Sequence, residues 1–223
     1  MKDPTVTTDN CRRCSRITEN IQHIISGCSH LANTDYKHRH DQVAKIIHQK
    51  ISVKCGLLQA STAYWKYTPP PVIENSSYKL LWDRNVITDV TCSNNRPDII
   101  LIDKAKRSAA LVEIACPNTT NLQTTIATKI SKYTELAIEI QRLWKLQSVV
   151  TVPIVISCTG VIPKSLHSSL ATLNLHHRTF VELQKAVLLS TCHIVRKFPG
   201  TSFPPHRTTQ QQEPLPTRSE IVT

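Results

Sequence analysis

Apolar positions repeat with two different periods along this chain, and the change of period predicts the order of its elements. Residues 36–54 are predicted to form an amphipathic helix, because apolar side chains recur there at helical spacing. These side chains are Val43, Ile46, Ile47 and Ile51. A cap is expected at Thr34 or Asp35, and the Pro-rich stretch 67–76 cannot continue a helix. The first helix is therefore predicted to stand apart from the elements that follow.

Four short, β-branched runs bounded by turn residues come next, and they predict a meander of strands. The runs cover residues 79–82, 85–91, 98–102 and 109–114. A period near 3.6 then predicts one long helix over residues 122–144. A further strand and two more helices are expected at residues 150–158, 163–173 and 180–195. Because the third and fourth runs are almost wholly apolar, both faces of the sheet should be covered, which predicts an α/β fold with a central sheet flanked by helices.

The length of 223 residues and the apolar content of 40% suit one catalytic-size domain with a small appended module. The polar residues 1–10 and the stretch 199–223, rich in Pro, Gln and Thr, are expected to be disordered. The module is predicted at residues 11–33 and the larger domain at residues 34–198.

The formal net charge of +11 favours a polyanionic partner, because phosphate backbones attract such charge. No run approaches the roughly 20 apolar residues of a membrane-spanning helix, and no apolar signal segment opens the chain. We therefore expect a soluble, intracellular protein that binds nucleic acid and no membrane. Of the eight cysteines, three cluster near the N-terminus and the others are scattered, which indicates metal binding rather than disulfides.

Cys11, Cys14, His23 and Cys28 follow the spacing Cys-x2-Cys-x8-His-x4-Cys, which is typical of a structural zinc site. Such a site stabilises a segment that is too short to have a core of its own. His30 is an alternative to His23 as the fourth ligand, and chance clustering of cysteines is the competing explanation. The module is expected either to hold nucleic acid or to brace the larger domain.

Asp98 opens one predicted strand and Glu113 lies near the end of the next, with DKAKRS as the connecting loop. In that hairpin register the two acids face each other directly, about 5 Å apart at Cβ. Two carboxylates so close are unfavourable unless a cation lies between them, which predicts a site for Mg²⁺ or Mn²⁺. Such an ion, held with a backbone carbonyl, could activate water for phosphodiester cleavage. The alternative is a pair of solvated strand-end acids, because a one-residue slip would place them on opposite faces.

A metal-dependent nuclease also needs a cation near the scissile phosphate, and the predicted long helix carries two lysines. With Ile126 at the centre of the apolar face, Lys129 lies about 60° away and Lys132 about 120° away. Lys129 is therefore the better candidate to reach inward, with a solvated position as its alternative, whereas Lys132 is expected to be solvated. Tyr133, one turn after Lys129, could donate a hydrogen bond to phosphate or belong to the core.

These residues carry a family resemblance. Pro97-Asp98, then Glu113 after fourteen intervening residues, resembles the PD-(D/E)xK nuclease superfamily, although Ala115 stands where the simplest motif has its lysine. In this departure the sequence is similar to the restriction-like endonuclease region of site-specific non-LTR retrotransposon polyproteins, where the lysine lies on the next helix in a context like KISKY. That region also follows a Cys/Cys/His/Cys knuckle, here CRRCSRITENIQHIISGC, and a segment like YKHRHDQVAKIIHQ. The resemblance covers roughly residues 11–160.

The resemblance implies a restriction-endonuclease-like core that nicks target DNA in the nucleus, so that a reverse transcriptase can prime on the freed 3′ hydroxyl. Asp98 and Glu113 would then hold the metal, Lys129 would orient water or stabilise the leaving phosphate, and Tyr133 would assist. The candidate DNA contacts are Arg39, His40, Arg96 and Lys132. For Arg39 and His40, bracing of the first helix is the alternative.

The expected partners are DNA, RNA of the element and a reverse-transcriptase domain, for which this chain has no room. The chain is therefore expected to be a fragment of an element, a relic or a host-adopted piece. Two other functions compete with an active nuclease: a zinc-braced nucleic-acid-binding module that has lost cleavage, and a purely structural interaction domain.

Overall fold

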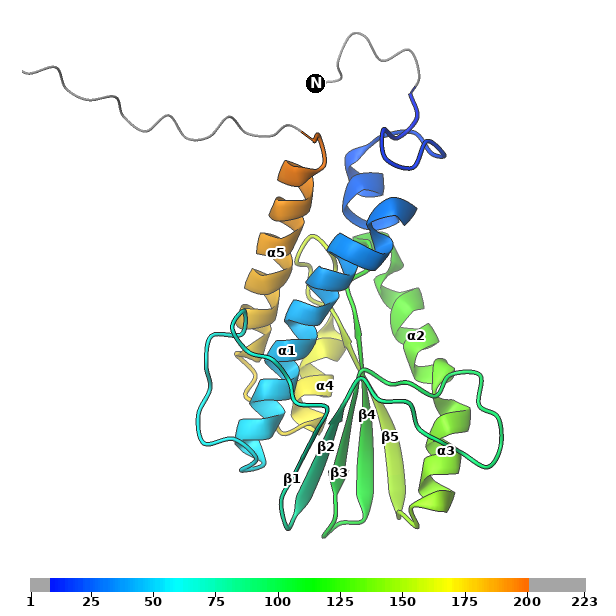
Figure 1. The fold of residues 1–223 in the computed structure, drawn as a ribbon, viewed down its shortest axis with the longest axis vertical. Helices are drawn as coiled ribbons and strands as arrows, with labels where there is room; N and C mark the ends of the chain where they lie inside the picture. Colours follow the sequence, from blue (N-terminus) through cyan, green and yellow to red (C-terminus); the bar gives the residue numbers. More distant parts are fainter. Residues whose placement is uncertain (1–8, 201–223) are drawn as a thin grey trace, which may run out of the picture.

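The computed structural model describes residues 9–200, in which a five-stranded sheet has helices on both faces (Figure 1). The strands lie in chain order: β1 (Val72–Glu74), β2 (Tyr78–Trp82), β3 (Ile99–Asp103), β4 (Ser108–Ala115) and β5 (Ser148–Val155). The pairs from β1 to β4 are antiparallel, whereas β5 joins β4 in parallel. The predicted α/β class with a mixed central sheet is confirmed.

The helices form two layers, and each layer has its own core. The first layer consists of α1 (Lys37–Lys54), α4 (Lys164–Thr172) and α5 (Thr179–Lys197). The second consists of α2 (Leu122–Lys132) and α3 (Thr134–Leu143), which connect the parallel strands β4 and β5. Successive residues of a strand point to opposite faces, so Ile99 enters the first core and Ile100 the second. This two-sided burial explains the nearly continuous apolar runs of β3 and β4.

The prediction of a strand at residues 85–91 is wrong, because these residues lie in the loop between β2 and β3. The strands β2 and β3 pair directly with each other, so the β-branched run between them has no neighbouring strand to join. Val86 is buried there, but Ile87 is 91% exposed. In contrast, the short edge strand β1 follows directly after Pro71, inside the stretch that was predicted to be a Pro-rich connection. Proline is tolerated there because an edge strand leaves one row of backbone groups unpaired.

The single long helix predicted over 122–144 is two helices, because the chain breaks at Tyr133, where φ is −109° and ψ is 13°. The break changes which side chains are buried: Leu136 and Ile140 of α3 enter the core, whereas Ile130 of α2 is exposed. Ile126 is only half-buried, so it does not mark the centre of a buried face. The break sets α2 apart as a separate element beside the end of the sheet (Figure 1).

The N-terminal module is continuous with the first helix. A π-helical turn, η3 (Ala32–Tyr36), runs directly into α1, so the boundary predicted at residue 34 falls inside it. Neither of the two expected caps accepts a capping hydrogen bond, because the chain is already helical before α1 begins. The predicted disordered ends lie outside the described residues, apart from residues 9–10 and 199–200, and Asn10 forms a bridge with Thr18.

Arg39 of α1 fastens this module to the core. Its Nη1 donates to the carbonyl of Ile25 at 2.8 Å and to Oγ1 of Thr191 at 3.0 Å, and its Nη2 lies 3.4 Å from the carbonyl of Cys116. The guanidinium also lies 5.1 Å from the centre of the Tyr36 ring. One side chain thus joins the module, α5 and the end of β4. At 1% exposure Arg39 has no surface for DNA, so the predicted DNA contact is wrong and the bracing alternative holds.

Replacing Arg39 by Met should lower the free energy of unfolding by about 2 to 3 kcal/mol, because charge-assisted hydrogen bonds are lost and buried carbonyl groups lose their donor. Urea denaturation followed by circular dichroism measures the change. Lys37→Met, on the same helix and with the same change of charge, is the matched control and should shift stability by no more than about 0.5 kcal/mol. Equal losses in the two variants would contradict the role assigned to Arg39.

Candidate active site

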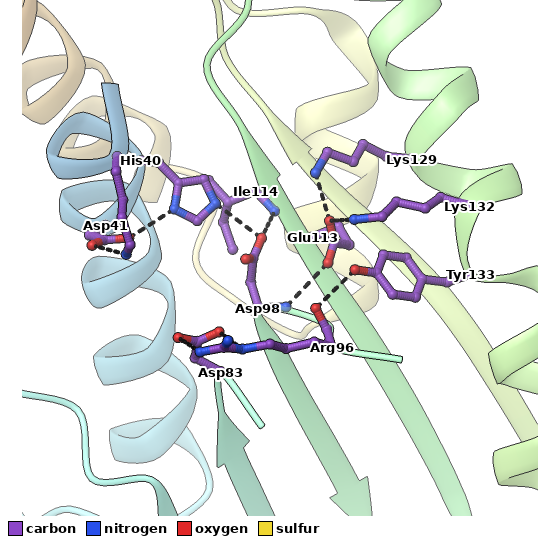
Figure 2. Close-up of polar contacts among 11 residues, drawn as sticks. His40, Asp41, Asp83, Arg96, Asp98, Glu113, Ile114, Lys129, Lys132 and Tyr133 are labelled. Atoms are coloured by element: carbon purple, nitrogen blue, oxygen red, sulfur yellow. Dashed lines mark hydrogen bonds and ion pairs between the residues drawn. The ribbon is translucent and has the colours of Figure 1, made fainter. Parts of the chain in front are cut away.

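The antiparallel pair β3–β4 brings the two acids together. Ile99 pairs with Val112, and the next position in this register sets Asp98 opposite Glu113, as the sequence predicted. The amide N–H of Asp98 donates to Oε1 of Glu113 at 3.2 Å, and the amide N–H of Ile114 donates to Oδ2 of Asp98 at 2.7 Å (Figure 2). Each carboxylate is thus held by the backbone of the opposite strand. The two acids lie side by side at one end of the sheet.

Two lysines of α2 converge on Glu113. The Nζ of Lys129 lies 2.7 Å and that of Lys132 lies 3.8 Å from the same oxygen, Oε2 (Figure 2). The Glu113 side chain is only 1% exposed, so an unpaired charge there would be strongly unfavourable. Lys129 reaches inward as its helical position predicted. Lys132 remains partly exposed, as expected of a helix-flank residue, but its ammonium turns to the site and lies 4.6 Å from the centre of the Tyr133 ring.

His40 reaches Asp98 from the other layer. Its Nε2 lies 3.1 Å from Oδ2 of Asp98, and its Nδ1 lies 3.0 Å from Oδ1 of Asp41 (Figure 2). Burial would lower the pKa of His40, but the hydrogen bonds and charges of these two carboxylates raise it to about 9. Burial would likewise raise the pKa of Asp98, but His40, the Ile114 amide and Lys129 hold it below its usual value. At neutral pH a His40 imidazolium therefore faces an ionised Asp98 carboxylate.

Tyr133 supports the site from inside the core. The side chain is 1% exposed, and its hydroxyl donates to the carbonyl of Arg96 at 3.0 Å. Burial and the neighbouring Glu113 raise the pKa of this hydroxyl far above its usual value. The predicted hydrogen bond from Tyr133 to phosphate does not fit this burial, so Tyr133 acts as a positioning residue for the chain that leads into Asp98. Tyr133 therefore belongs to the core, which was the alternative to a phosphate contact.

Arg96 lies at the surface beside the acids. Its guanidinium forms a two-pronged ion pair with Asp83, with both N–O distances at 2.7 Å. A cavity of about 490 Å³ adjoins this pair, and Asp98, His40 and Trp82 also line it. Arg96 and the cavity are therefore available to a ligand that approaches Asp98 from solvent.

Sequence reasoning gave His40 either a contact with DNA or a bracing role in the first helix, and it missed the contact with Asp98. Hairpin register places residues of neighbouring strands, but it gives no information on which turn of a distant helix crosses the strand end. The only signal was the segment YKHRHDQVAKIIHQ, which contains both His40 and Asp41. The pairing of Asp83 with Arg96 was missed for the same reason, since it depends on how the loop after β2 folds.

The Cys/His cluster forms a second candidate site at the N-terminus. The ligand atoms of Cys11, Cys14, His23 and Cys28 all lie within 4.8 Å of one another. The sulfurs of Cys11 and Cys28 are 3.9 Å apart, and Cys14 Sγ is 3.3 Å from Nε2 of His23. Zn–S bonds of about 2.3 Å in a tetrahedron place sulfurs about 3.8 Å apart, so the cluster fits a metal ion such as zinc. His30 is not part of it.

Within residues 9–200, this cluster is the only group of three or more His, Cys, Asp or Glu residues with metal-sharing distances. The acid pair of Asp98 and Glu113 has no third such ligand within that range, so any ion held there would depend on water, backbone or substrate oxygens for the rest of its coordination.

The chain is thus an α/β protein with a mixed sheet, a paired-acid centre at the sheet end and a Cys/His centre that could hold a metal. No protein-family model matches it, and no curated protein matches its sequence. None of the described helices has the length and apolar character needed to cross a membrane.

Zinc binding tests whether His23 or His30 is the fourth ligand of the cluster. His23→Ala should lose the metal, because it removes a ligand of the cluster, whereas His30→Ala should keep one equivalent per chain. Elemental analysis of protein purified with added zinc measures the stoichiometry. Zinc retained by His23→Ala but lost by His30→Ala would overturn the assignment.

Tyr133→Phe tests the positioning role. Removing the hydroxyl leaves the Arg96 carbonyl without its donor and should lower the free energy of unfolding by about 1 kcal/mol. Chemical denaturation measures this loss. Tyr64→Phe is the matched control, since no hydrogen bond is assigned to its hydroxyl among the described residues. A loss for Tyr133→Phe no greater than for this control would contradict the role.

Proposed function

We propose that this protein is a metal-dependent DNA endonuclease in which Asp98 and Glu113 hold Mg²⁺ or Mn²⁺. The observation that carries the proposal is the pair of carboxylates fixed side by side at the end of β3 and β4, with the ammonium of Lys129 at 2.7 Å from Glu113. Magnesium is commonly bound by one or two carboxylates together with waters and phosphate oxygens, so this small donor set suits it. When bound, such an ion stabilises developing charge on phosphate and makes water a better nucleophile.

The chain's own groups have distinct roles in this proposal. Lys129 is close enough to exchange its contact with Glu113 for one with a phosphate oxygen or the attacking water, and Lys132 provides a second positive charge beside it. His40 holds the carboxylate of Asp98 in place through a charge-assisted hydrogen bond. Hydrolysis adds water to phosphorus and breaks the bond to the 3′ oxygen, which leaves a 3′ hydroxyl and a 5′ phosphate.

DNA is the favoured substrate because cationic side chains stand beside the acid pair and the chain as a whole is strongly basic. Arg96 is 55% exposed beside Asp98, Lys132 is partly exposed next to Glu113, and the whole chain has a net charge of +11. Arg96 and Lys132 therefore remain candidate contacts to the phosphate backbone, where they would position the duplex without reading its sequence.

The family resemblance supports a finer version of this proposal. It suggests a restriction-like endonuclease of a non-LTR retrotransposon, acting in the nucleus with a reverse-transcriptase domain and element RNA. The mixed sheet with its acids on adjacent strands, and the lysine on the next helix rather than at Ala115, agree with that relationship. The N-terminal module, with zinc as its structural ion, would then brace α1 through Arg39.

A second function is favoured by one specific observation. Both carboxylates already have cationic partners, since Glu113 pairs with Lys129 and Asp98 pairs with His40. These ion pairs satisfy the acids without any divalent metal. A zinc-braced module that binds nucleic acid without cleaving it is therefore the alternative to an active nuclease.

Nicking of supercoiled plasmid distinguishes the two functions. Wild-type protein should convert plasmid to open circles only when Mg²⁺ or Mn²⁺ is present, whereas Asp98→Asn and Glu113→Gln should lose at least about a hundredfold in rate. Lys129→Ala should lose more than Lys132→Ala, because Lys129 lies closer to Glu113.

Glu182→Gln on the surface of α5 is the control for removal of one acid and should cut at the wild-type rate. The proposed metal-dependent nuclease function would be excluded by equal nicking activity in wild type and Asp98→Asn. It would also be excluded if nicking continued at the same rate after the divalent metal was chelated. Salt-dependent binding of DNA without any metal-dependent nicking would select the binding module.

A further inference from the structure

A second concave surface lies on the face of the sheet that α3 leaves partly open. The groove has a volume of about 600 Å³ and runs over β1, β2 and β3 to the C-terminal end of α3. Its floor is apolar, with Leu81 and Ile102 among the lining residues, and Trp144 adds an aromatic ring. Asp98 and Glu113 do not line it, so it is separate from the candidate active site.

The charge of this groove is one-sided. Four cations line it and no acidic residue does: the cations are Lys79, Arg84, Lys104 and Arg107. The two lysines share one nearby carboxylate, Glu74, at 3.2 and 2.6 Å. Arg107 donates to the neutral carbonyl of Lys145, and among residues 9–200 no acid is paired with Arg84. Positive charge therefore remains after all these contacts are counted.

The groove is joined to the candidate active site by a short connection. Arg84 lies directly after Asp83, whose amide N–H donates to the carbonyl of Asp98 at 2.8 Å. The side chain of Asp83 also pairs with Arg96. One end of the groove therefore adjoins the backbone that holds the catalytic acid, and the other end lies at the turn between β3 and β4, where Lys104 and Arg107 stand.

We propose that this groove binds single-stranded DNA, with phosphates on Arg84 and Arg107 and a base against Trp144. A basic groove with an aromatic side chain suits a single strand, because unstacked bases can lie on the ring while the backbone follows the cations. A duplex keeps its bases stacked inside and cannot use the aromatic ring in this way. The choice of DNA rests on the proposed nuclease function, since a strand freed at Asp98 would lie beside the groove.

Binding is measured by fluorescence anisotropy on the full chain with Asp98→Asn, so that no cleavage interferes. The probes are oligothymidylate of about 12 nucleotides, oligouridylate of the same length, and a blunt duplex. Arg84→Gln/Arg107→Gln should weaken binding of oligothymidylate about tenfold and reduce its salt dependence by about 1.4 in log–log slope, because about 0.7 is lost for each phosphate contact in a single strand. Duplex binding should change less than twofold.

Trp144 gives an independent test of stacking. Trp144→Ala should weaken oligothymidylate binding about tenfold, whereas Trp144→Phe should stay within about threefold of the parent, because a smaller aromatic ring still stacks. Phe also keeps most of the packing against α3 and the sheet, so it separates loss of stacking from loss of fold.

The matched control is Arg178→Gln/Lys185→Gln, which removes two exposed positive charges from the region of α5. Equal weakening by this pair would show that net charge alone matters and would overturn the proposal. Equal loss of duplex binding, or a loss confined to oligouridylate, would also overturn it. Failure of the plasmid-nicking assay would reject the nuclease but would leave these binding results intact.

Discussion

The candidate site depends on two hydrogen bonds between the ends of β3 and β4, in each of which a backbone amide of one strand end donates to a carboxylate of the other. The Asp98 amide holds Glu113, and the Ile114 amide holds Asp98, so the strand register itself fixes where both carboxylates lie. A slip by one residue would send every side chain of one strand to the opposite face and separate the acids. The apolar residues on both faces of these strands prevent that slip, because either face would then bury the wrong side chains. Core packing and site geometry are therefore set by the same interaction.

Burial of the two acids explains why both helical layers are needed. A buried carboxylate is unfavourable unless a charge or several donors accompany it, and the two layers each provide a cation. His40 comes from α1 and Lys129 from α2, so the acids are stabilised only when both layers are packed on the sheet. Arg39 holds the N-terminal module against α1, one residue before His40. The Cys/His centre is thereby connected to the acid pair through a single helix.

Local patterns predicted the features that depend on neighbouring residues. The register of Asp98 and Glu113 followed from a short loop between two apolar runs. The inward position of Lys129 was also predicted, although Ile126, from which its angle on the helix was measured, is only half-buried. Features set by distant contacts could not be predicted in this way. Tyr133 ends α2 although the apolar period continues through it, and Val86 and its neighbours form a loop although they have strand-like composition. The contact of His40 with Asp98 requires the packing of α1 on the sheet, which no local pattern encodes.

Direct counting of bound Mn²⁺ by electron paramagnetic resonance, on zinc-loaded protein with and without duplex DNA, tests the central claim most closely. The account predicts at least one Mn²⁺ per chain in the presence of DNA, because phosphate oxygens complete the coordination that two carboxylates begin. Asp98→Asn and Glu113→Gln should each lose this ion while retaining zinc. Equal Mn²⁺ binding by wild-type protein and both variants, or no binding by any of them, would contradict the assignment of the acid pair as a metal site.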